Sequence, residues 1–225
     1  MSTQPLDVRY YLAALKLEGK SCLVVGGGPI AAEKIDGLLA AGARVTVVAK
    51  DAIPPVRTLA ADGSIELTLR PFRVDDLDGR FLAVAGTSDE RLNRHIHAAA
   101  EERDMLVNVV DVPALCNFIL PAVTRLGPIA IAVSTSGASP ALAKRMRNEI
   151  EAAFGAEYAL LAVLLNEARD WARDRLPTYQ DRKAFFDSIV GGDPDPIEML
   201  RSNGEEAVRA LIDARMRRAA DSQVA

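Results

Sequence analysis

Three consecutive glycines, Gly26 to Gly28, follow an apolar segment at residues 21–25 and precede a helical pattern at residues 31–41. An uninterrupted apolar run that glycines end abruptly is typical of a strand buried on both faces of a parallel sheet. Gly42 follows the helical pattern, where helices commonly end in a glycine. These residues therefore predict a strand, a tight turn and a helix, the first unit of an α/β fold.

Further apolar segments repeat this pattern along the N-terminal half of the chain. The side chains of Thr87, Ser88 and Asp89 provide N-cap groups for a helix that extends to about Arg103. Strands that alternate with helices form right-handed crossovers and a parallel sheet. We predict a Rossmann-type, doubly wound domain over residues 1–113. Its remaining strands are predicted at residues 44–48, 65–69, 81–85 and 106–110.

The pattern changes after Pro113. Residues 118–124 and 129–134 favour β-structure, and only residues 125–128 separate them. This connection is too short for a parallel crossover, so we expect the two strands to be antiparallel. Because two strands alone are marginally stable in water, we expect residues 114–150 to form a small α+β segment for dimerisation and substrate binding.

The last third of the chain has helical patterns that glycines and prolines interrupt. We predict a C-terminal helical domain over residues 151–225, with Trp171 in its core. The helices, including one before this boundary, are predicted near residues 140–154, 156–175, 181–190 and 204–219.

Charge and cysteine usage restrict the class of protein. The net charge of −4 and the sequence pI of about 5.3 argue against a nucleic-acid partner, because nucleic-acid binding requires basic surfaces. Cys22 and Cys116 are the only cysteines, which indicates a reducing compartment. The first 20 residues include charged side chains, and no run of about 18 uncharged apolar residues occurs. We therefore expect a cytoplasmic protein without a signal peptide or a membrane partner.

The glycine loop also predicts a ligand. Gly26-x-Gly28-x-x-Ala31 matches the G-x-G-x-x-G/A pattern of dinucleotide-binding domains. The first glycine permits the turn, the second lets the backbone approach a pyrophosphate, and the small third residue lets helix and strand pack closely. We expect Gly26, Gly28, Pro29 and Ile30 to bind NAD at the helix N-terminus. A glycine turn without any nucleotide is the alternative.

The choice between NAD and NADP stays open on the motif alone. The acidic residue that binds the ribose usually ends the second strand, here at or near Val48. Lys50 and Asp51 follow instead, so that Asp51 comes about three residues late. We expect both residues to contact the cofactor, and Lys50 could accept the 2′-phosphate of NADP.

Five motifs between about residues 20 and 150 combine into a resemblance. They are Gly26-Gly27-Gly28-Pro29-Ile30-Ala31-Ala32-Glu33-Lys34, Ala85-Gly86-Thr87-Ser88-Asp89, Asn108-Val109-Val110-Asp111-Val112-Pro113, Phe118-Ile119-Leu120-Pro121-Ala122 and Ser134-Thr135-Ser136-Gly137-Ala138-Ser139-Pro140. In this order they resemble the precorrin-2 dehydrogenase family, which includes stand-alone enzymes and the N-terminal part of multifunctional sirohaem synthases. No motif is matched after about residue 155, and we expect no methyltransferase domain.

The resemblance implies an activity and an assembly. It implies that precorrin-2 loses a hydride to NAD and becomes sirohydrochlorin, and NAD is preferred over NADP on this ground only. It also implies a homodimer in which residues 114–150 exchange contacts between subunits. Within the matched motifs, Thr87 is expected to bind the cofactor and Asn108 the substrate.

Asp111 is the predicted catalytic residue. It follows the fifth predicted strand, and ligands of doubly wound sheets bind outside the carboxyl ends of the strands. A carboxylate there could position the macrocycle or accept a proton. The alternative is an aspartate that caps the turn before Pro113.

The segment from Ser134 to Pro140 is the predicted substrate loop. We expect the hydroxyls of Ser134, Thr135 and Ser136 to hold substrate carboxylates, with Lys144 on the following helix adding positive charge. The alternatives are plain N-capping of that helix by Ser139 and a solvated helix face for Lys144.

Two other functions remain open at this point. One is a bifunctional dehydrogenase and ferrochelatase in which Asp111 also assists metal insertion, although no cluster of metal ligands is visible and none is expected. His95 and His97, two residues apart on a helix, point away from each other. The other is a non-enzymatic module that senses nucleotides, which would leave residues 108–113 and 134–140 without a role.

Overall fold

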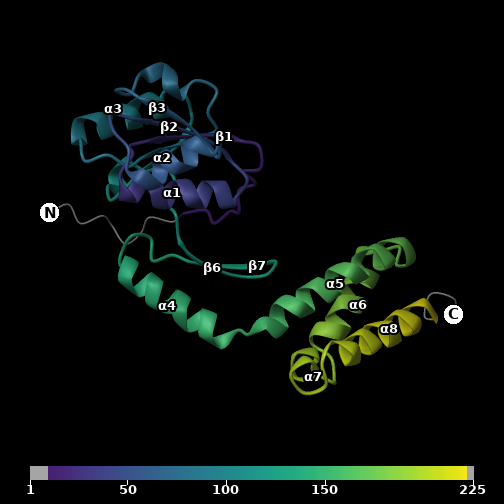
Figure 1. Cartoon of the computed structure of the whole chain (residues 1–225). Helices are drawn as coiled ribbons and strands as arrows, with labels where there is room; N and C mark the ends of the chain where they lie inside the picture. Colours follow the sequence, from purple (N-terminus) through teal and green to yellow (C-terminus); the bar gives the residue numbers. More distant parts are fainter. Residues whose placement is uncertain (1–9, 222–225) are drawn as a thin grey trace. The chain divides into compact units, whose positions relative to one another are not determined.

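The structure is a computed structural model that describes residues 10–221 (Figure 1). The described chain forms two compact units, one that ends at Leu120 and one that begins at Pro121. Each unit has hydrophobic core residues of its own. Within residues 10–221, no helix is long and apolar enough to cross a membrane.

The first unit contains one parallel sheet with the strand order β3-β2-β1-β4-β5. The chain moves outward from β1 to β3, returns to the other side of β1 and continues to β5. This reversal creates a crevice at the carboxyl ends of β1 and β4, where doubly wound sheets bind their ligands. The strands are β1 (Ser21–Val25), β2 (Arg44–Ala49), β3 (Ile65–Leu69), β4 (Leu82–Ala85) and β5 (Leu106–Val109).

Helices cover both faces of this sheet (Figure 1). Alternate residues of β1 point to opposite faces, so Cys22 and Val24 pack on one side while Leu23 and Val25 pack on the other. The first side holds α1 (Pro29–Ala40) and α2 (Pro54–Ala61). The second holds η1 (Val74–Leu77) and α3 (Glu90–Glu101). The predicted Rossmann-type, doubly wound sheet is confirmed, and Asp89 caps α3 as expected.

The second unit begins with a β-hairpin and continues as helices. Its strands β6 (Ala122–Leu126) and β7 (Ile129–Val133) are antiparallel, as predicted. The helix α4 packs on both strands, and α5 to α8 form a bundle around a separate core in which Trp171 packs 5.3 Å from Phe185 between ring centroids. The helices are α4 (Pro140–Ala153), α5 (Ala156–Arg175), α6 (Tyr179–Val190), α7 (Pro196–Asn203) and α8 (Glu205–Asp221).

The predicted bounds of the hairpin were wrong. The first strand begins at Ala122 rather than at residue 118, and the connection is two residues long rather than four, because Leu126 pairs directly with Ile129. Gly127 adopts a φ of 55°, and a positive φ at the first central position is what a two-residue type II′ turn requires. The glycine therefore permits a tighter hairpin than the sequence pattern indicated.

Two helices that begin with prolines were not predicted. The helix α2 begins with Pro54 and Pro55, and α7 begins with Pro196. Proline is tolerated in the first turn, where its missing N–H has no intrahelical partner. At α7, the Asp195 carboxylate also accepts a hydrogen bond of 2.8 Å from the backbone N–H of Ile197, and this N-cap completes the start signal.

Candidate functional site

A cavity of about 850 Å³ lies at the carboxyl ends of the parallel strands. All of its lining residues belong to the first unit. They come from the glycine loop after β1, the segment after β2, the segment after β3, the turn after β4 with the start of α3, and the end of β5. The lining residues are 25–30, 48–51, 70–72, 86–90, 92–93 and 110–112.

The three loop glycines meet different surroundings. Gly26 has a φ of 122°, and a Cβ there would lie 2.5 Å from the carbonyl oxygen of Gly86. A Cβ on Gly27 would lie 2.3 Å from the carbonyl oxygen of Asp51. A Cβ on Gly28 would meet no protein atom within 4 Å. The first two glycines are thus required by the fold, whereas Gly28 leaves open space beside the backbone at the cavity.

The N-terminus of α1 faces this space without a capping side chain. Gly28 is the N-cap, Pro29 occupies the first turn and has no N–H, and no acidic residue lies in that turn. The first intrahelical bond runs from Ala32 N–H to Gly28 O at 3.0 Å, which leaves the N–H groups of Ile30 and Ala31 ahead of the hydrogen-bond ladder. Such a terminus attracts an anion through its N–H groups and the helix dipole. These residues fit the phosphates of a dinucleotide.

Asp51 and Lys50 line the cavity just beyond β2. The Oδ1 atom of Asp51 accepts hydrogen bonds from the backbone N–H of Ala52 at 2.8 Å and from Nη2 of Arg57 at 2.6 Å. These two bonds, the backbone bond above all, hold the pKa of Asp51 below its usual range. Asp51 is therefore an ionised acceptor, and the exposed Lys50 is a cation next to it.

Thr87 also lines the cavity, at the end of β4, where its hydroxyl is already engaged. Its Oγ1 donates to Oδ1 of the buried Asn93 at 2.7 Å and accepts from the backbone N–H of Asp89 at 3.2 Å. Asn93 Nδ2 donates in return to the carbonyl oxygen of Thr87 at 3.0 Å. These bonds fix the turn between β4 and α3, so Thr87 shapes the cavity wall.

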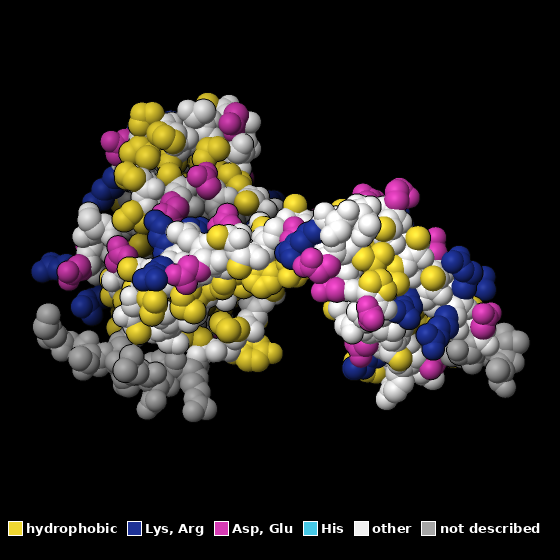
Figure 2. Space-filling view, turned by 90° about the horizontal axis from the view of Figure 1, so that it is seen from below, with side chains coloured by type: hydrophobic (Ala, Val, Ile, Leu, Met, Phe, Trp, Pro, Cys, Tyr) yellow, Lys and Arg dark blue, Asp and Glu magenta, His cyan; other side chains and the backbone are white. Residues whose placement is uncertain are grey.

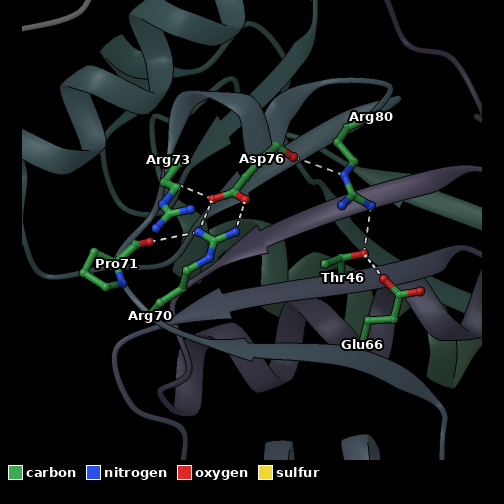
Figure 3. A network of polar contacts seen from close by, with 7 residues as sticks. All are labelled: Thr46, Glu66, Arg70, Pro71, Arg73, Asp76 and Arg80. Atoms are coloured by element: carbon green, nitrogen blue, oxygen red, sulfur yellow. Dashed lines mark hydrogen bonds and ion pairs between the residues drawn. The ribbon is translucent and has the colours of Figure 1, made fainter.

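Arg70, Pro71 and Phe72 form a wall that the sequence analysis missed. Arg70 donates two hydrogen bonds, of 2.8 and 2.5 Å, to the carboxylate of Asp76, which also accepts from the backbone N–H of Arg73 at 2.7 Å (Figure 3). The Arg70 guanidinium lowers the pKa of Asp76. The position of Arg70 directly after a predicted strand was the available signal, because the carboxyl ends of parallel strands share one edge.

The same polar network continues into the sheet (Figure 3). Arg80 donates from Nε to the carbonyl oxygen of Asp76 at 3.1 Å and from Nη1 to Thr46 Oγ1 at 2.8 Å. Thr46 in turn donates to Oε2 of Glu66 at 3.1 Å. The wall that carries Arg70 is therefore tied to β2 and β3 by hydrogen bonds.

Asp111 lies at the opposite end of the cavity lining, directly after β5. It is exposed, and its φ of 61° lies in the left-handed region that residues other than glycine rarely adopt. Within the described part of the chain its carboxylate has no hydrogen bond or ion pair. A capping aspartate would accept a nearby N–H, so the described chain does not show the turn cap that was the alternative for Asp111.

Asn108 does not line the cavity. It is buried in β5, and its Nδ2 donates to the carbonyl oxygen of Phe118 at 3.1 Å. The half-buried Cys116 lies beside it, 3.6 Å from Nδ2 to Sγ, and burial raises the pKa of the Cys116 thiol. The structure thus employs Asn108 and Cys116 in holding the segment that follows Asp111.

The predicted substrate loop lies in the second unit, between β7 and α4. Ser134 Oγ accepts from the backbone N–H of Ser136 at 3.1 Å, and Thr135 Oγ1 accepts from the backbone N–H of Ser139 at 3.0 Å. The Ser139 side chain caps α4, as one of the alternatives stated. Each of the two accepting hydroxyls keeps its own proton for donation. Lys144 is exposed on α4.

The surface of the chain mixes both signs of charge. Figure 2 shows Lys and Arg side chains interspersed with Asp and Glu over the face in view. Among the residues of the described chain, no three His, Cys, Asp or Glu side chains lie close enough together to hold a metal ion.

Two protein-family models match separate parts of the chain, close to the boundary between its two compact units. A family model described as putative NAD(P)-binding matches residues 13–122, and a model described as the central part of a sirohaem biosynthesis protein matches residues 127–153. The N-terminal unit is therefore an NAD(P)-binding domain.

The chain is also similar to curated relatives and to a solved structure over most of its length. The chain is 39% identical over 215 residues to a siroheme synthase of Thioalkalivibrio sulfidiphilus, covering 95% of this chain and 43% of the relative. It is 42% identical over 195 residues to a siroheme synthase of Pseudomonas fluorescens, covering 87% of this chain and 42% of the relative. The chain thus spans less than half the length of these relatives. The structure of SirC, a precorrin-2 dehydrogenase, is 26% identical with a TM-score of 0.72, and the match covers 93% of this chain and 100% of SirC.

Proposed function

Because this chain belongs to the precorrin-2 dehydrogenase family, we propose that it oxidises precorrin-2 to sirohydrochlorin with NAD as the hydride acceptor. The observation that carries this proposal is a single cavity lined by both the glycine loop and Asp111. The loop supplies the anion-binding helix N-terminus, and Asp111 supplies a free carboxylate. A site that only sensed the nucleotide would have no use for that carboxylate.

The reaction removes one hydride and one proton from the macrocycle. A bound NAD⁺ would supply the two-electron acceptor for that hydride. The proton passes to a base, and we assign this role to the Asp111 carboxylate, which then releases it to water. Asp111 has a left-handed backbone and follows β5, where it lines the cavity. Its ionised side chain can only accept hydrogen bonds, so it can take up the proton that the macrocycle loses as its conjugated system forms.

The charges of the lining residues favour NAD over NADP. The cavity is lined by four acidic residues and only two cations, Lys50 and Arg70. Asp76 neutralises Arg70 through two hydrogen bonds, so Lys50 is the one remaining counter-charge in the lining. Asp51 has its own partner in Arg57, which does not line the cavity. The extra phosphate of NADP would still add about −1.5 to −2 charges to a lining in which acids outnumber cations. A ribose hydroxyl, in contrast, can donate to the Asp51 carboxylate.

The substrate is expected to contact the loop between β7 and α4. Ser134 and Thr135 have hydroxyl protons available, and Ser136 adopts a φ of 51°, a conformation that turns successive backbone N–H groups toward one side. Lys144 adds an exposed positive charge one turn into α4. These residues remain our candidates for recognising the carboxylates of a tetrapyrrole, whereas the buried Asn108 supports the segment that follows Asp111.

We also propose that the chain forms a homodimer through residues 122–153. Of the 14 residues of α4, only Ala143 is buried, and the apolar Leu142 and Met146 are 48% and 41% exposed. The hairpin on which α4 packs has two strands, too few to be stable without further cover. A second copy of this segment would cover both.

An anaerobic assay tests the proposed function. The protein is incubated with precorrin-2 and either NAD or NADP, while the absorbance of the reduced nicotinamide and of the macrocycle is followed. We expect one reduced cofactor per sirohydrochlorin formed, with a higher kcat/KM for NAD. Absence of turnover with both cofactors, in a protein that binds NAD, would contradict the dehydrogenase assignment.

A further inference from the structure

The backbone of Asp111 must be held in place by its surroundings. A φ of 61° is uncommon outside glycine, although aspartate adopts it more readily than most residues, and local contacts decide whether it persists. The Asp111 side chain itself makes no hydrogen bond within the described chain, so it cannot stabilise its own turn. The contacts that impose this conformation therefore come from the residues around it.

One sulfur atom contacts both ends of the turn that contains Asp111. Cys116 Sγ accepts from the backbone N–H of Val109 at 3.2 Å and lies 3.2 Å from the carbonyl oxygen of the same residue. It also lies 3.4 Å from the carbonyl oxygen of Val112, and its single proton is donated to one of the two carbonyls. The backbone N–H of Val112 donates to Val109 O at 3.1 Å and closes the turn.

Cys116 is in turn fixed against the free edge of the sheet. β5 is an edge strand, and residues 116–118 run along its open side. The Oδ1 atom of Asn117 accepts from the backbone N–H of Val107 at 2.7 Å, and the backbone N–H of Asn117 donates to Val107 O at 3.1 Å. Asn108 adds its bond to Phe118 O. Residues 116–118 thus replace a sixth strand and hold the sulfur in position.

We propose that Cys116 is a positioning residue for catalysis, whose thiol clamps Val109 and Val112 and so aims the Asp111 carboxylate at the substrate. This inference rests on the proposed role of Asp111 and adds how that residue is held. The thiol performs no chemistry on the substrate. Burial keeps it protonated, which is the form that donates to a carbonyl. The competing explanation is that Cys116 is a small residue that merely fills space.

Paired cysteine variants distinguish these explanations. Cys116→Ala removes the clamp, whereas Cys22→Ala removes the same atoms from a fully buried site on β1, where Sγ only approaches Lys20 O at 3.8 Å. We expect Cys116→Ala to lower kcat about tenfold, since small displacements of a reacting group are costly, with an unchanged Kd for NAD. Cys116→Ser, which keeps a donor and an acceptor, should recover most of the loss. Cys22→Ala should keep the kcat of the wild type.

Two further readouts separate this inference from the proposed function. If Cys116 acts through Asp111, adding Cys116→Ala to Asp111→Ala should not lower kcat further. Hydrogen exchange at the amides of Val109 and Val112 should accelerate in Cys116→Ala but not in Cys22→Ala, whatever the activity. Unchanged exchange at both amides, or a wild-type kcat in Cys116→Ala while Asp111→Ala is impaired, would overturn the role of Cys116. Full turnover by Asp111→Ala would instead refute the assignment of Asp111.

Discussion

Gly27 and Gly28 are neighbours in the loop between β1 and α1, but a side chain at each would point into different surroundings. Gly28→Val should project into the open space where the pyrophosphate is proposed to bind, and Gly28 has an extended backbone that valine tolerates. We expect an at least tenfold higher Kd for NAD with a nearly unchanged melting temperature. Titration calorimetry and thermal melts check both.

Gly27→Ala is the matched control for that prediction. Its Cβ would overlap the backbone of Asp51, so overpacking should lower the free energy of unfolding by about 1–3 kcal/mol. An unchanged affinity for NAD in folded Gly28→Val would show that the glycine loop does not bind the pyrophosphate.

We expect the stability of the first unit to depend on pH through Asp76. Its hydrogen bonds from Arg70 keep its pKa below the usual value of about 3.9, so the carboxylate stabilises the fold at neutral pH. This contribution is complete above the unfolded-state pKa and is lost as the pH falls through the lower folded-state pKa. Asp76→Asn should therefore be less stable at neutral pH, and the difference from the wild type should shrink below about pH 4.

Urea unfolding of the wild type and Asp76→Asn between pH 7 and pH 2 measures this difference. A difference in unfolding free energy that stays constant down to pH 2 would mean that the Arg70–Asp76 pair is not coupled to folding.

At the scale of elements, α4 has only Ala143 buried within the described chain, and the hairpin on which it packs has only two strands. If they form the dimer interface, Leu142→Glu should place a charge in it and produce monomers at micromolar concentration. Val190→Glu is the control, since Val190 is 55% exposed at the end of α6, outside the proposed interface. Sedimentation of all three proteins is the measurement, and a monomeric wild type would contradict the homodimer.

The elements also differ in how well the sequence predicted them. Buried parallel strands have continuous apolar patterns, and β1 was therefore predicted with its observed bounds. β6 was displaced because residues 118–120 are equally apolar, and only the turn geometry of Gly127 places the pairing. The helix α2, which begins with two prolines, was not predicted. Local patterns thus indicated the type of element better than its ends.

At the scale of the whole molecule, the parallel sheet and the position of the cavity at its edge were predictable because both follow from chain order. The strand pattern places the ends of β1, β2, β4 and β5 at one edge, and the predicted Gly26, Gly28, Asp51, Thr87 and Asp111 all line the cavity there. The hydrogen bonds of Asn108 and Cys116 could not be predicted, because their partners lie across a loop whose path only the folded chain determines. The pairing of Arg70 with Asp76 could not be predicted for the same reason.

The proposed dehydrogenase function depends most on Asp111, and turnover of its variants is the most direct test. Asp111→Asn removes the charge and basicity while keeping a residue type that tolerates the left-handed region. We predict that anaerobic oxidation of precorrin-2 by Asp111→Asn and Asp111→Ala falls about 10²- to 10⁴-fold, as for the loss of a general base, while the Kd for NAD stays that of the wild type. Near wild-type turnover by the folded variants would contradict the proposed proton acceptor.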